Sequence, residues 1–387
     1  MIAAERKDAV LRELRLRGSL TVNEFAQRLG ISPITLRRDL QELERAGRLT
    51  RVHGGATSVQ QQAAAPPPLE LNSRRLAASF GLTPKAARDE PTVATIGMIV
   101  PTRGYYYADI IDGAKDAARL AGVRLVLAIS DYNQSEERRI FRRMLDLGVD
   151  GILITPSKSE LVDSPLRDLI ESSSVPVTVV ERVWEFPTRG RSVDSVRSDH
   201  RFGAELAVTH LAELGHRKLG LWSFDNPHVA EITGGFEAAA ARYGCVLHRP
   251  GFDYGHPEWD SVDPIRNVIR YVTEAVDAGV TALIVHPDQL ALQVVQTALE
   301  LGIDVPTDLS IVAYDDEIAS LGERLLTAIA PPKHAIGFAA TDSCLRAIAH
   351  ENPDGAGFPA QRIRLLPALR QRESTAPPNG VSHSDRF

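Results

Sequence analysis

Carboxylate, arginine and tyrosine side chains follow a series of short apolar runs in the second part of this 387-residue chain. Carboxylates accept hydrogen bonds from hydroxyl groups, arginine donates to oxygen atoms, and aromatic rings cover the apolar faces of a ring-shaped molecule. These residue types therefore predict a binding site for a small polyhydroxylated ligand. The groups, in chain order, are Tyr105-Tyr106-Tyr107, Ser130-Asp131, Glu181-Arg182, Pro287-Asp288 and Asp315-Asp316.

Each of these aspartates also has a purely structural interpretation. Aspartate is favoured at the N-terminal caps of helices, where its carboxylate accepts backbone N–H groups. What favours ligand binding is that the side chains recur at equivalent places, directly beyond successive apolar runs. We expect some of them to meet at one edge of a sheet.

The elements that would position these groups are parallel strands alternating with helices. Short apolar runs rich in β-branched residues alternate with amphipathic stretches such as 108–122 and 136–148, a rhythm typical of βα units with helices on both faces of a parallel sheet. In such sheets the ligand lies beyond the carboxyl ends of the strands. The predicted strands are 96–100, 123–129, 151–155, 175–180, 218–222, 282–286 and 309–314.

The N-terminal residues 5–59 show a different pattern. Apolar residues at helical spacing predict one helix that ends near Gly18 and a second from Val22 to Leu29, and Ser32 followed by Pro33 predicts the start of a third. A strand pair with a turn at His53-Gly54-Gly55 would follow. This order is that of a winged helix-turn-helix, which binds double-stranded DNA.

The charge of this segment agrees with DNA binding. Residues 1–59 carry 11 Lys and Arg against 7 Asp and Glu, whereas the remainder carries 33 against 43. Phosphate neutralisation by basic groups supplies most non-specific DNA affinity. A small helical domain whose arginines only keep it in solution is the alternative. The predicted DNA-binding residues are Ser32, Ile34, Thr35, Arg37, Arg38, Gln41, Arg48, Arg51, His53 and Gly54.

Residues 1–59 resemble the DNA-binding domain of DeoR-type repressors. The matching residues run from Gly18 and Leu20 through Thr35-Leu36-Arg37-Arg38-Asp39-Leu40 to His53-Gly54-Gly55-Ala56. The resemblance implies binding to operator DNA through the third helix and the wing.

Residues 93–376 resemble the effector domain of the lactose/galactose repressor (LacI/GalR) family, which has the fold of periplasmic sugar-binding proteins. Matching segments include 96–101, 149–152, 211–217, 314–316 and 372–375. The resemblance implies an α/β fold with two lobes of the type I arrangement, joined by three crossovers, with the effector between them. Carried over residue by residue, the family's ligand-binding positions correspond to Tyr105, Tyr106, Tyr107, Asp131, Arg182, Trp259, Asp288 and Asp315.

Two residues depart from that family. Ile232 stands where an effector-binding arginine is common, and Pro287 stands where asparagine frequently precedes the aspartate. The architecture departs as well, because sugar-repressor effector domains normally follow a different helix-turn-helix and a short hinge helix. DeoR-type domains in turn usually precede a sugar-phosphate isomerase-like sensor. The chain is therefore interpreted as a hybrid whose allosteric coupling does not follow from either family.

The Gln-, Ala- and Pro-rich run 60–68 predicts a linker over residues 60–92, and the polar residues 377–387 predict a disordered tail. Only two cysteines are present, Cys245 and Cys344, and no His/Glu or CxxC spacing predicts a metal site or a cofactor. Neither a signal peptide nor an apolar run of ~18 residues is evident, so no membrane contact is expected. These features predict a cytoplasmic protein.

Together these features predict a homodimeric DNA-binding transcriptional regulator, in the first place a repressor, of carbohydrate metabolism or uptake. Its effector would be a sugar or sugar derivative. The alternatives are a sugar-active enzyme or a transport-type sugar receptor with an accessory DNA-binding module. No nucleophile elbow, phosphate-binding loop or dinucleotide fingerprint supports an enzyme.

Overall fold

The computed structural model of the chain divides into two compact units, residues 1–72 and 73–387, and each is described by itself. The described residues are 6–7, 10, 19–22, 25–26, 31–45, 48–52, 55–58, 94–158, 161, 164–185, 193–224, 226–249, 264–350 and 359–379. Among the helices of these ranges, none is both long and apolar enough to cross a membrane.

The first unit has the predicted third helix, α3 (Pro33–Arg45), and a small antiparallel sheet. The sheet has the order β1-β3-β2, formed by Ser19–Thr21, Gly55–Ser58 and Leu49–Val52. The sequence predicted the β2–β3 pair but not β1, because three residues are too few for a visible alternation. A compact core holds the unit together, formed by Val10, Val22, Phe25, Ala26, Leu36, Leu40, Leu43 and Leu49.

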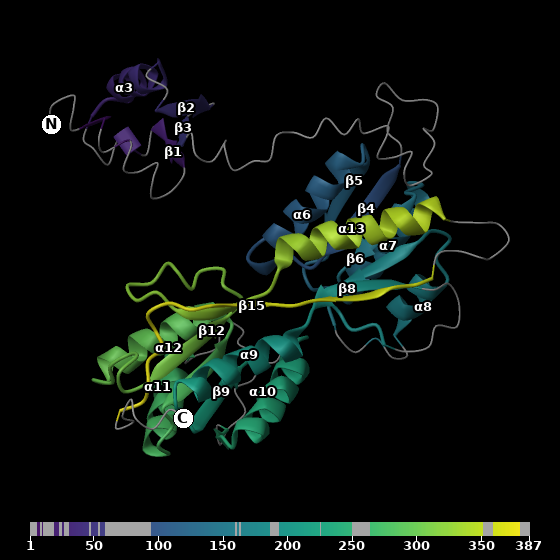
Figure 1. Ribbon diagram of the computed structural model, residues 1–387. Coiled ribbons are helices and arrows are strands. Elements are labelled where there is room, and N and C mark those ends of the chain that lie inside the picture. The colour runs from purple at the N-terminus through teal and green to yellow at the C-terminus, as the bar shows by residue number, and fades with distance from the viewer. Residues whose placement is uncertain are drawn as a thin grey trace. The chain divides into compact units, whose positions relative to one another are not determined.

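The second unit contains two α/β lobes (Figure 1). The first lobe has a fully parallel sheet of order β14-β8-β7-β6-β4-β5. Its strands are β4 (Thr95–Val100), β5 (Arg124–Ile129), β6 (Gly151–Ile154), β7 (Val177–Val180), β8 (Asp194–Ser198) and β14 (Arg362–Leu365). Helices α6 (Tyr106–Leu120) and α13 (Lys333–Ala349) pack on one face, and α7 (Gln134–Asp146) and α8 (Pro165–Glu171) on the other.

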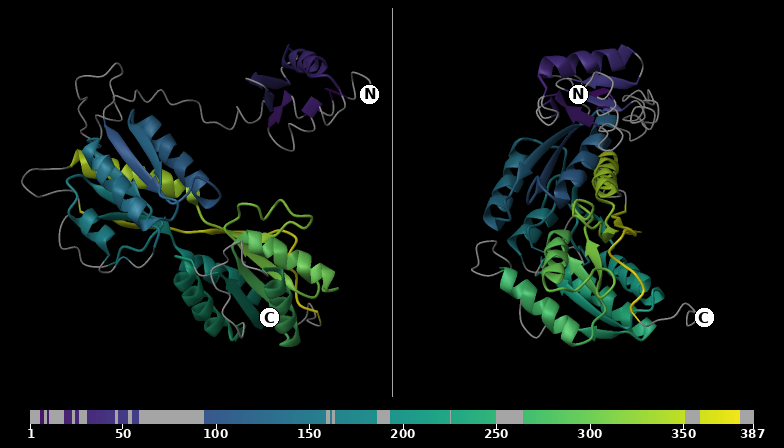
Figure 2. Two further views of the ribbon diagram at one scale, coloured as in Figure 1. Left: turned by 180° about the vertical axis from the view of Figure 1, so that it is seen from behind. Right: turned by 90° about the vertical axis from the view of Figure 1, so that its left-hand side faces the viewer.

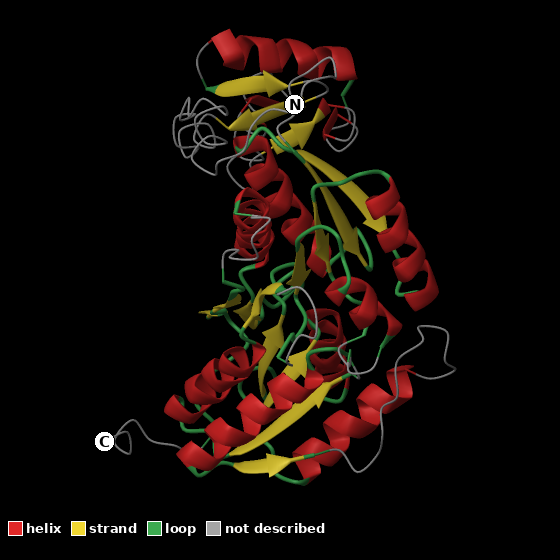
Figure 3. Cartoon of the chain, turned by 90° about the vertical axis from the view of Figure 1, so that its right-hand side faces the viewer, coloured by secondary structure: helices red, strands yellow, loops and turns green. Residues whose placement is uncertain are grey.

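The second lobe repeats this design with the strand order β10-β9-β11-β12-β13-β15. All neighbours are parallel except β13 and the edge strand β15. The strands are β9 (Lys218–Ser223), β10 (Val246–His248), β11 (Ala282–His286), β12 (Ser310–Tyr314), β13 (Thr327–Ala330) and β15 (Ala368–Arg370). Helices α9 (His200–Glu213) and α10 (Val229–Tyr243) cover one face, and α11 (Pro264–Asp277) and α12 (Asp288–Glu300) the other. Figure 3 shows the helices of both lobes in red beside the strands in yellow.

The chain passes between the lobes three times, as the resemblance implied: from β8 to α9, from β13 to α13, and from β14 to β15 (Figure 2). All seven predicted strands form, as β4, β5, β6, β7, β9, β11 and β12. The five strands that the sequence did not predict, β8, β10, β13, β14 and β15, lie towards the edges of the two sheets. Their sequences lack the continuous apolar character of central parallel strands.

Helix caps account for part of the polar residues between the elements. Asn133 accepts the backbone N–H groups of Ser135 and Glu136 at the start of α7. Asp199 accepts the N–H of Phe202 at the start of α9. These caps satisfy helix N–H groups that have no partner within the helix.

The contact between α9 and α10 depends on one glycine of an adjacent pair. A Cβ atom on Gly235 would lie 2.2 Å from the carbonyl oxygen of Arg201, which is backbone and cannot give way. A Cβ atom on Gly234 would meet only the end of the Arg201 side chain, at 3.5 Å. Only the absence of a side chain at residue 235 therefore allows the two helices to come this close.

We expect Gly235→Ala to destabilise the protein by about 1–3 kcal/mol, because overpacking forces α9 and α10 apart. Gly234→Ala is the matched control, and we expect it to be neutral or to stabilise by up to about 1 kcal/mol, since alanine favours helix. Urea unfolding of both variants measures the difference. Equal free energies of unfolding would show that this close helix contact does not matter.

Candidate functional site

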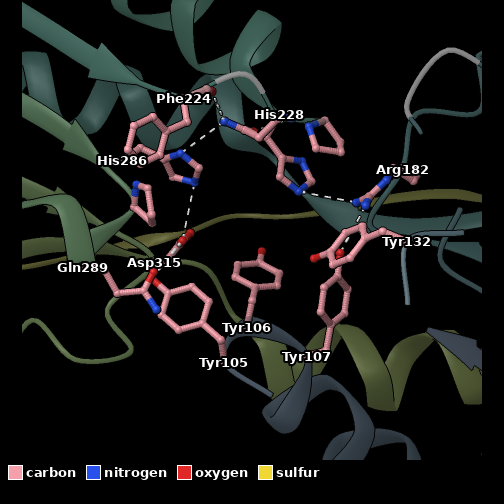
Figure 4. Close-up of a pocket in the computed structure, with 13 residues that line it drawn as sticks. Tyr105, Tyr106, Tyr107, Tyr132, Arg182, Phe224, His228, His286, Gln289 and Asp315 are labelled. Carbon is pink, nitrogen blue, oxygen red and sulfur yellow. Dashed lines mark hydrogen bonds and ion pairs between the residues drawn. The ribbon is translucent and has the colours of Figure 1, made fainter. Parts of the chain in front are cut away.

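A cavity of about 240 Å³ lies between the two lobes, beyond the carboxyl ends of their strands (Figure 4). Its wall is mainly aromatic, with a few polar groups converging on it, as in many small-ligand sites. It is lined by Tyr105, Tyr106, Tyr107, Tyr132, Arg182, Phe224, Asn226, Pro227, His228, His286, Pro287, Gln289 and Asp315. Five of the eight predicted ligand residues are among them: the three consecutive tyrosines, Arg182 and Asp315.

The three tyrosines at the start of α6 reach different partners. Tyr105 has a positive φ of 48°, and its hydroxyl donates to Asp288 and lies 3.3 Å from Asp315 Oδ2, so a first-lobe residue bonds to second-lobe carboxylates. The hydroxyl of Tyr106 donates to Glu181 at 2.9 Å. The hydroxyl of Tyr107 accepts from the Arg182 guanidinium at 3.1 Å.

Arg182 is buried in the wall, with a 2% exposed surface. One terminal nitrogen donates to the carbonyl of Glu181 at 2.6 Å, and the other to Tyr107. Its Nε atom has no hydrogen-bond partner in the described part of the chain. A buried donor without a partner is costly, so Arg182 has an unused hydrogen-bond donor beside the cavity that it lines.

Asp315 provides the matching acceptor from the second lobe. Its Oδ2 atom lies 3.4 Å from His286 Nε2, and Oδ1 has no hydrogen-bond partner among the described residues. Burial by itself raises the pKa of Asp315, but His286 and Lys333 outweigh it and lower that pKa below its usual value. Asp315 is therefore an ionised acceptor, able to accept a charge-assisted hydrogen bond from a ligand hydroxyl.

Asp288 does not line the cavity. One of its carboxylate oxygens accepts the backbone N–H groups of Glu317, Ile318 and Ala319, at 2.8, 2.7 and 3.0 Å. The other accepts from Tyr105. Burial raises the pKa of Asp288. The structure thus gives Asp288 the structural role, as a bridge between α12 and the loop after β12, and it reaches a ligand only through Tyr105.

Of the remaining two predicted ligand residues, one lies away from the cavity and the other lies outside the described residues. Asp131 is exposed, has a positive φ of 48°, and is not among the lining residues. Trp259 lies outside the described residues. Ile232, which stands where the family commonly has an arginine, is fully buried in the core of the second lobe.

Several lining residues were not predicted from the sequence. Phe224, Asn226, Pro227 and His228 follow β9, whereas His286 and Gln289 flank the end of β11. The signal was available, because both strands were predicted and ligands bind beyond strand ends. The prediction considered mainly carboxylates, arginine and consecutive tyrosines, and so missed histidines and amides.

A second candidate surface is the outer face of α3. Ser32 accepts the backbone N–H of Thr35 at 3.1 Å, which starts the helix, while Leu36 and Leu40 face the core. The Arg38 side chain is 82% exposed, and Gln41 and Arg48 are exposed too. The side chains of Ile34, Arg37 and Arg51, and all of His53 and Gly54, lie outside the described residues.

The buried face of α3 is fixed by an ion pair. Asp39 is 3% exposed and accepts two hydrogen bonds from the Arg6 guanidinium, at 2.8 and 3.1 Å. This bidentate pair ties the helix to a residue 33 positions earlier in the chain. It keeps the exposed face with Arg38 and Gln41 directed to solvent.

Comparison with known proteins identifies both parts of the chain. A DeoR-like helix-turn-helix domain matches residues 6–62, and a periplasmic binding protein-like domain matches residues 208–375. The arabinose metabolism transcriptional repressor of Geobacillus stearothermophilus is 25% identical over 351 residues, covering 89% of each chain.

Solved structures agree with this fold. The transcription regulator CcpA of Lactococcus lactis has a TM-score of 0.59 and is 20% identical, covering 73% of this chain and 99% of that one. A LacI family transcriptional regulator from Enterococcus faecium with bound ribose has a TM-score of 0.56 and is 24% identical, with the same coverage. At this identity the likeness shows a shared fold.

We expect Asp288→Ala to destabilise the protein by about 3 kcal/mol, because three backbone N–H groups lose their acceptor. Asp131→Asn is the control, since asparagine tolerates the positive φ and the side chain is exposed, and we expect a change within about 0.5 kcal/mol. Thermal and urea unfolding measure both. An undisturbed Asp288→Ala protein would rule out the structural role of this carboxylate.

Proposed function

We propose that this chain, which joins a DeoR-like helix-turn-helix domain to a periplasmic binding protein-like domain, is a repressor of carbohydrate-metabolism genes. A sugar or sugar derivative bound in the cavity would control its affinity for operator DNA. The observation that carries the proposal is that Arg182 from one lobe and Asp315 from the other both line the cavity, and that each has a buried polar atom without a hydrogen-bond partner among the described residues. A polyhydroxylated ligand supplies both an acceptor and a donor.

The aromatic wall supports this ligand class. Tyrosine and phenylalanine rings cover the C–H faces of a pyranose or furanose, while the polar groups bind its hydroxyls. The cavity is smaller than the ~300–1,000 Å³ common for drug-sized ligands. It therefore suits a molecule of roughly monosaccharide size.

Hydrogen bonds and an ion pair connect the two lobes, and an effector that alters these contacts would change the arrangement of the lobes. Tyr105 bonds to Asp288 and Asp315 across the cavity, and Arg197 on β8 pairs with Glu231 on α10. A ligand acts as an effector only if its affinity differs between two arrangements of the protein. A sugar that binds Arg182 and Asp315 together would favour the arrangement in which the lobes are close.

We propose further that the protein acts as a cytoplasmic homodimer on double-stranded DNA. Two copies of α3 and the wing would bind the halves of a palindromic operator, about one helical turn (~34–36 Å) or a multiple apart. The curated relative and the solved structures above are named as transcription regulators rather than enzymes.

The defining experiment is fluorescence anisotropy with the DNA upstream of the protein's own operon, against a scrambled duplex, at two salt concentrations, with and without a panel of sugars. Selective binding that one sugar shifts supports the proposal. Weak binding that is equal on both duplexes and insensitive to every sugar contradicts it.

Within this assay, we expect Arg38→Ala to weaken operator binding by about 10- to 100-fold, the value of a base contact, with less effect on the scrambled duplex. Arg51→Ala should cause a smaller loss that is the same on both duplexes, because we assign Arg51 to a phosphate. If both variants lose equally on both duplexes, α3 is not the recognition helix.

For the effector, we expect Asp315→Asn to raise the sugar concentration that gives half the response by about tenfold, since a charge-assisted hydrogen bond becomes neutral. Asparagine is chosen because it tolerates the φ of 99° at this position. DNA affinity without sugar should stay unchanged, and Asp131→Asn should leave the response intact. An unaltered sugar response in Asp315→Asn would move the effector out of this cavity.

A further inference from the structure

Three side chains with metal-binding atoms meet where the chain first crosses between the lobes. Glu181 follows β7 in the first lobe, His200 opens α9 in the second, and His228 directly precedes α10. One ligand atom from each lies within 4.8 Å of the others. Tyr106 and His228 line the cavity, so this cluster borders it.

The first two ligands are already spaced for an ion. Glu181 Oε2 and His200 Nε2 are 3.6 Å apart. A tetrahedral zinc ion with bonds of ~2.0–2.2 Å holds neighbouring ligand atoms about 3.4 Å apart. The ring of His228 lies 4.0 Å from that of His200, centroid to centroid, and one of its nitrogens lies within 4.8 Å of the other two ligand atoms, so the His228 ring has to shift to complete the set.

The hydrogen bonds of His200 leave the right nitrogen free. The Tyr314 hydroxyl donates to the His200 carbonyl at 3.1 Å, so its oxygen accepts from His200 Nδ1 at 3.3 Å. The neutral ring then has its lone pair on Nε2. This atom belongs to a residue that is 1% exposed, and it has no hydrogen-bond partner among the described residues. Ligation would give this buried nitrogen a closer partner than the Glu181 carboxylate oxygen, which lies 3.6 Å away.

An outer layer of bonds already orients these ligands. Glu181 accepts from the Tyr106 hydroxyl through Oε1 and from the Ser198 N–H through Oε2, at 2.9 and 3.2 Å. Metal-binding histidines and carboxylates are usually held by such second partners, which fix the ligand atom and its direction. Tyr314 supplies this partner for His200.

Two arginines near His228, Arg182 and Arg197, oppose a cation, and Arg197 is already paired with Glu231. The Arg182 guanidinium approaches His228 Nε2 only at the long distance of 3.5 Å, while its firmer bonds go to the Glu181 carbonyl and Tyr107. His228 can therefore turn away without leaving the arginine unpaired. The Glu181 carboxylate offsets the added positive charge.

We propose that Glu181, His200 and His228 bind a divalent transition-metal ion such as Zn²⁺. Two imidazoles and one carboxylate suit this class of ion and leave one coordination position for water or for an oxygen of the cavity ligand. The ion joins both lobes beside the crossover. It therefore stabilises their close arrangement, in addition to the control by a sugar.

The test is isothermal titration calorimetry, in which ZnCl₂ is added to the untagged, EDTA-treated full-length protein. We expect one site per chain, weakened at least about tenfold in His228→Gln and in Glu181→Gln, because loss of even a second-layer partner costs 10–100-fold. His334→Gln is the matched control: His334 is exposed and lies 3.1 Å from the carboxylate of Asp116, and we expect its titration to equal that of the wild type.

Two measurements guard against a variant that fails to fold. Zn²⁺ should raise the unfolding temperature of the wild type and of His334→Gln but not of His228→Gln. Co²⁺ bound to the wild type should show the strong visible absorption of a tetrahedral site. Absence of Zn²⁺ binding below millimolar concentration, equal binding by His228→Gln and His334→Gln, or a weak octahedral Co²⁺ spectrum overturns the proposal.

Discussion

The three passages of the chain between the lobes are the constraint on which the second unit depends. Parallel strands place all their carboxyl ends at one edge of a sheet, and the crossings at β8–α9, β13–α13 and β14–β15 bring the two edges face to face. Loops that are distant in sequence then share one small volume. The cavity, with its aromatic wall and its few charged groups, is a consequence of this connectivity.

Polar bonds across that volume give the lobes a defined arrangement rather than a loose hinge. Tyr105 from the first lobe reaches Asp288 and Asp315 in the second, and Arg197 pairs with Glu231. Hydrogen bonds to charged groups contribute about 1.5–3 kcal/mol each, comparable with the few kcal/mol that separate functional states. A ligand or a metal ion that replaces or adds to these bonds can therefore shift the balance between arrangements.

In the first unit a few contacts fix the orientation of helix α3. Leu36 and Leu40 anchor one face of α3 in the core, and Asp39 binds Arg6, so Arg38 and Gln41 remain exposed on the other face. Because the apolar face of α3 is buried in the core, its polar face is directed to solvent. The exposed face of α3 is the surface that we propose for DNA, and the cavity is the site that we propose for a small molecule, the two requirements of a ligand-controlled repressor.

The sequence by itself determined the class of fold, the seven central strands and the third helix of the first unit, because hydrophobic periodicity is a local feature. It also determined five of the residues that line the cavity, including Arg182 and Asp315, because the ends of strands are visible in the sequence. Only the tertiary structure decided which residues far apart in the sequence come into contact. It turned Asp288 towards backbone N–H groups and left Asp131 exposed. It also brought Glu181, His200 and His228 together, which have no metal-site spacing in the sequence. These contacts depend on how the chain passes between the two lobes, and no local pattern of residues encodes that path.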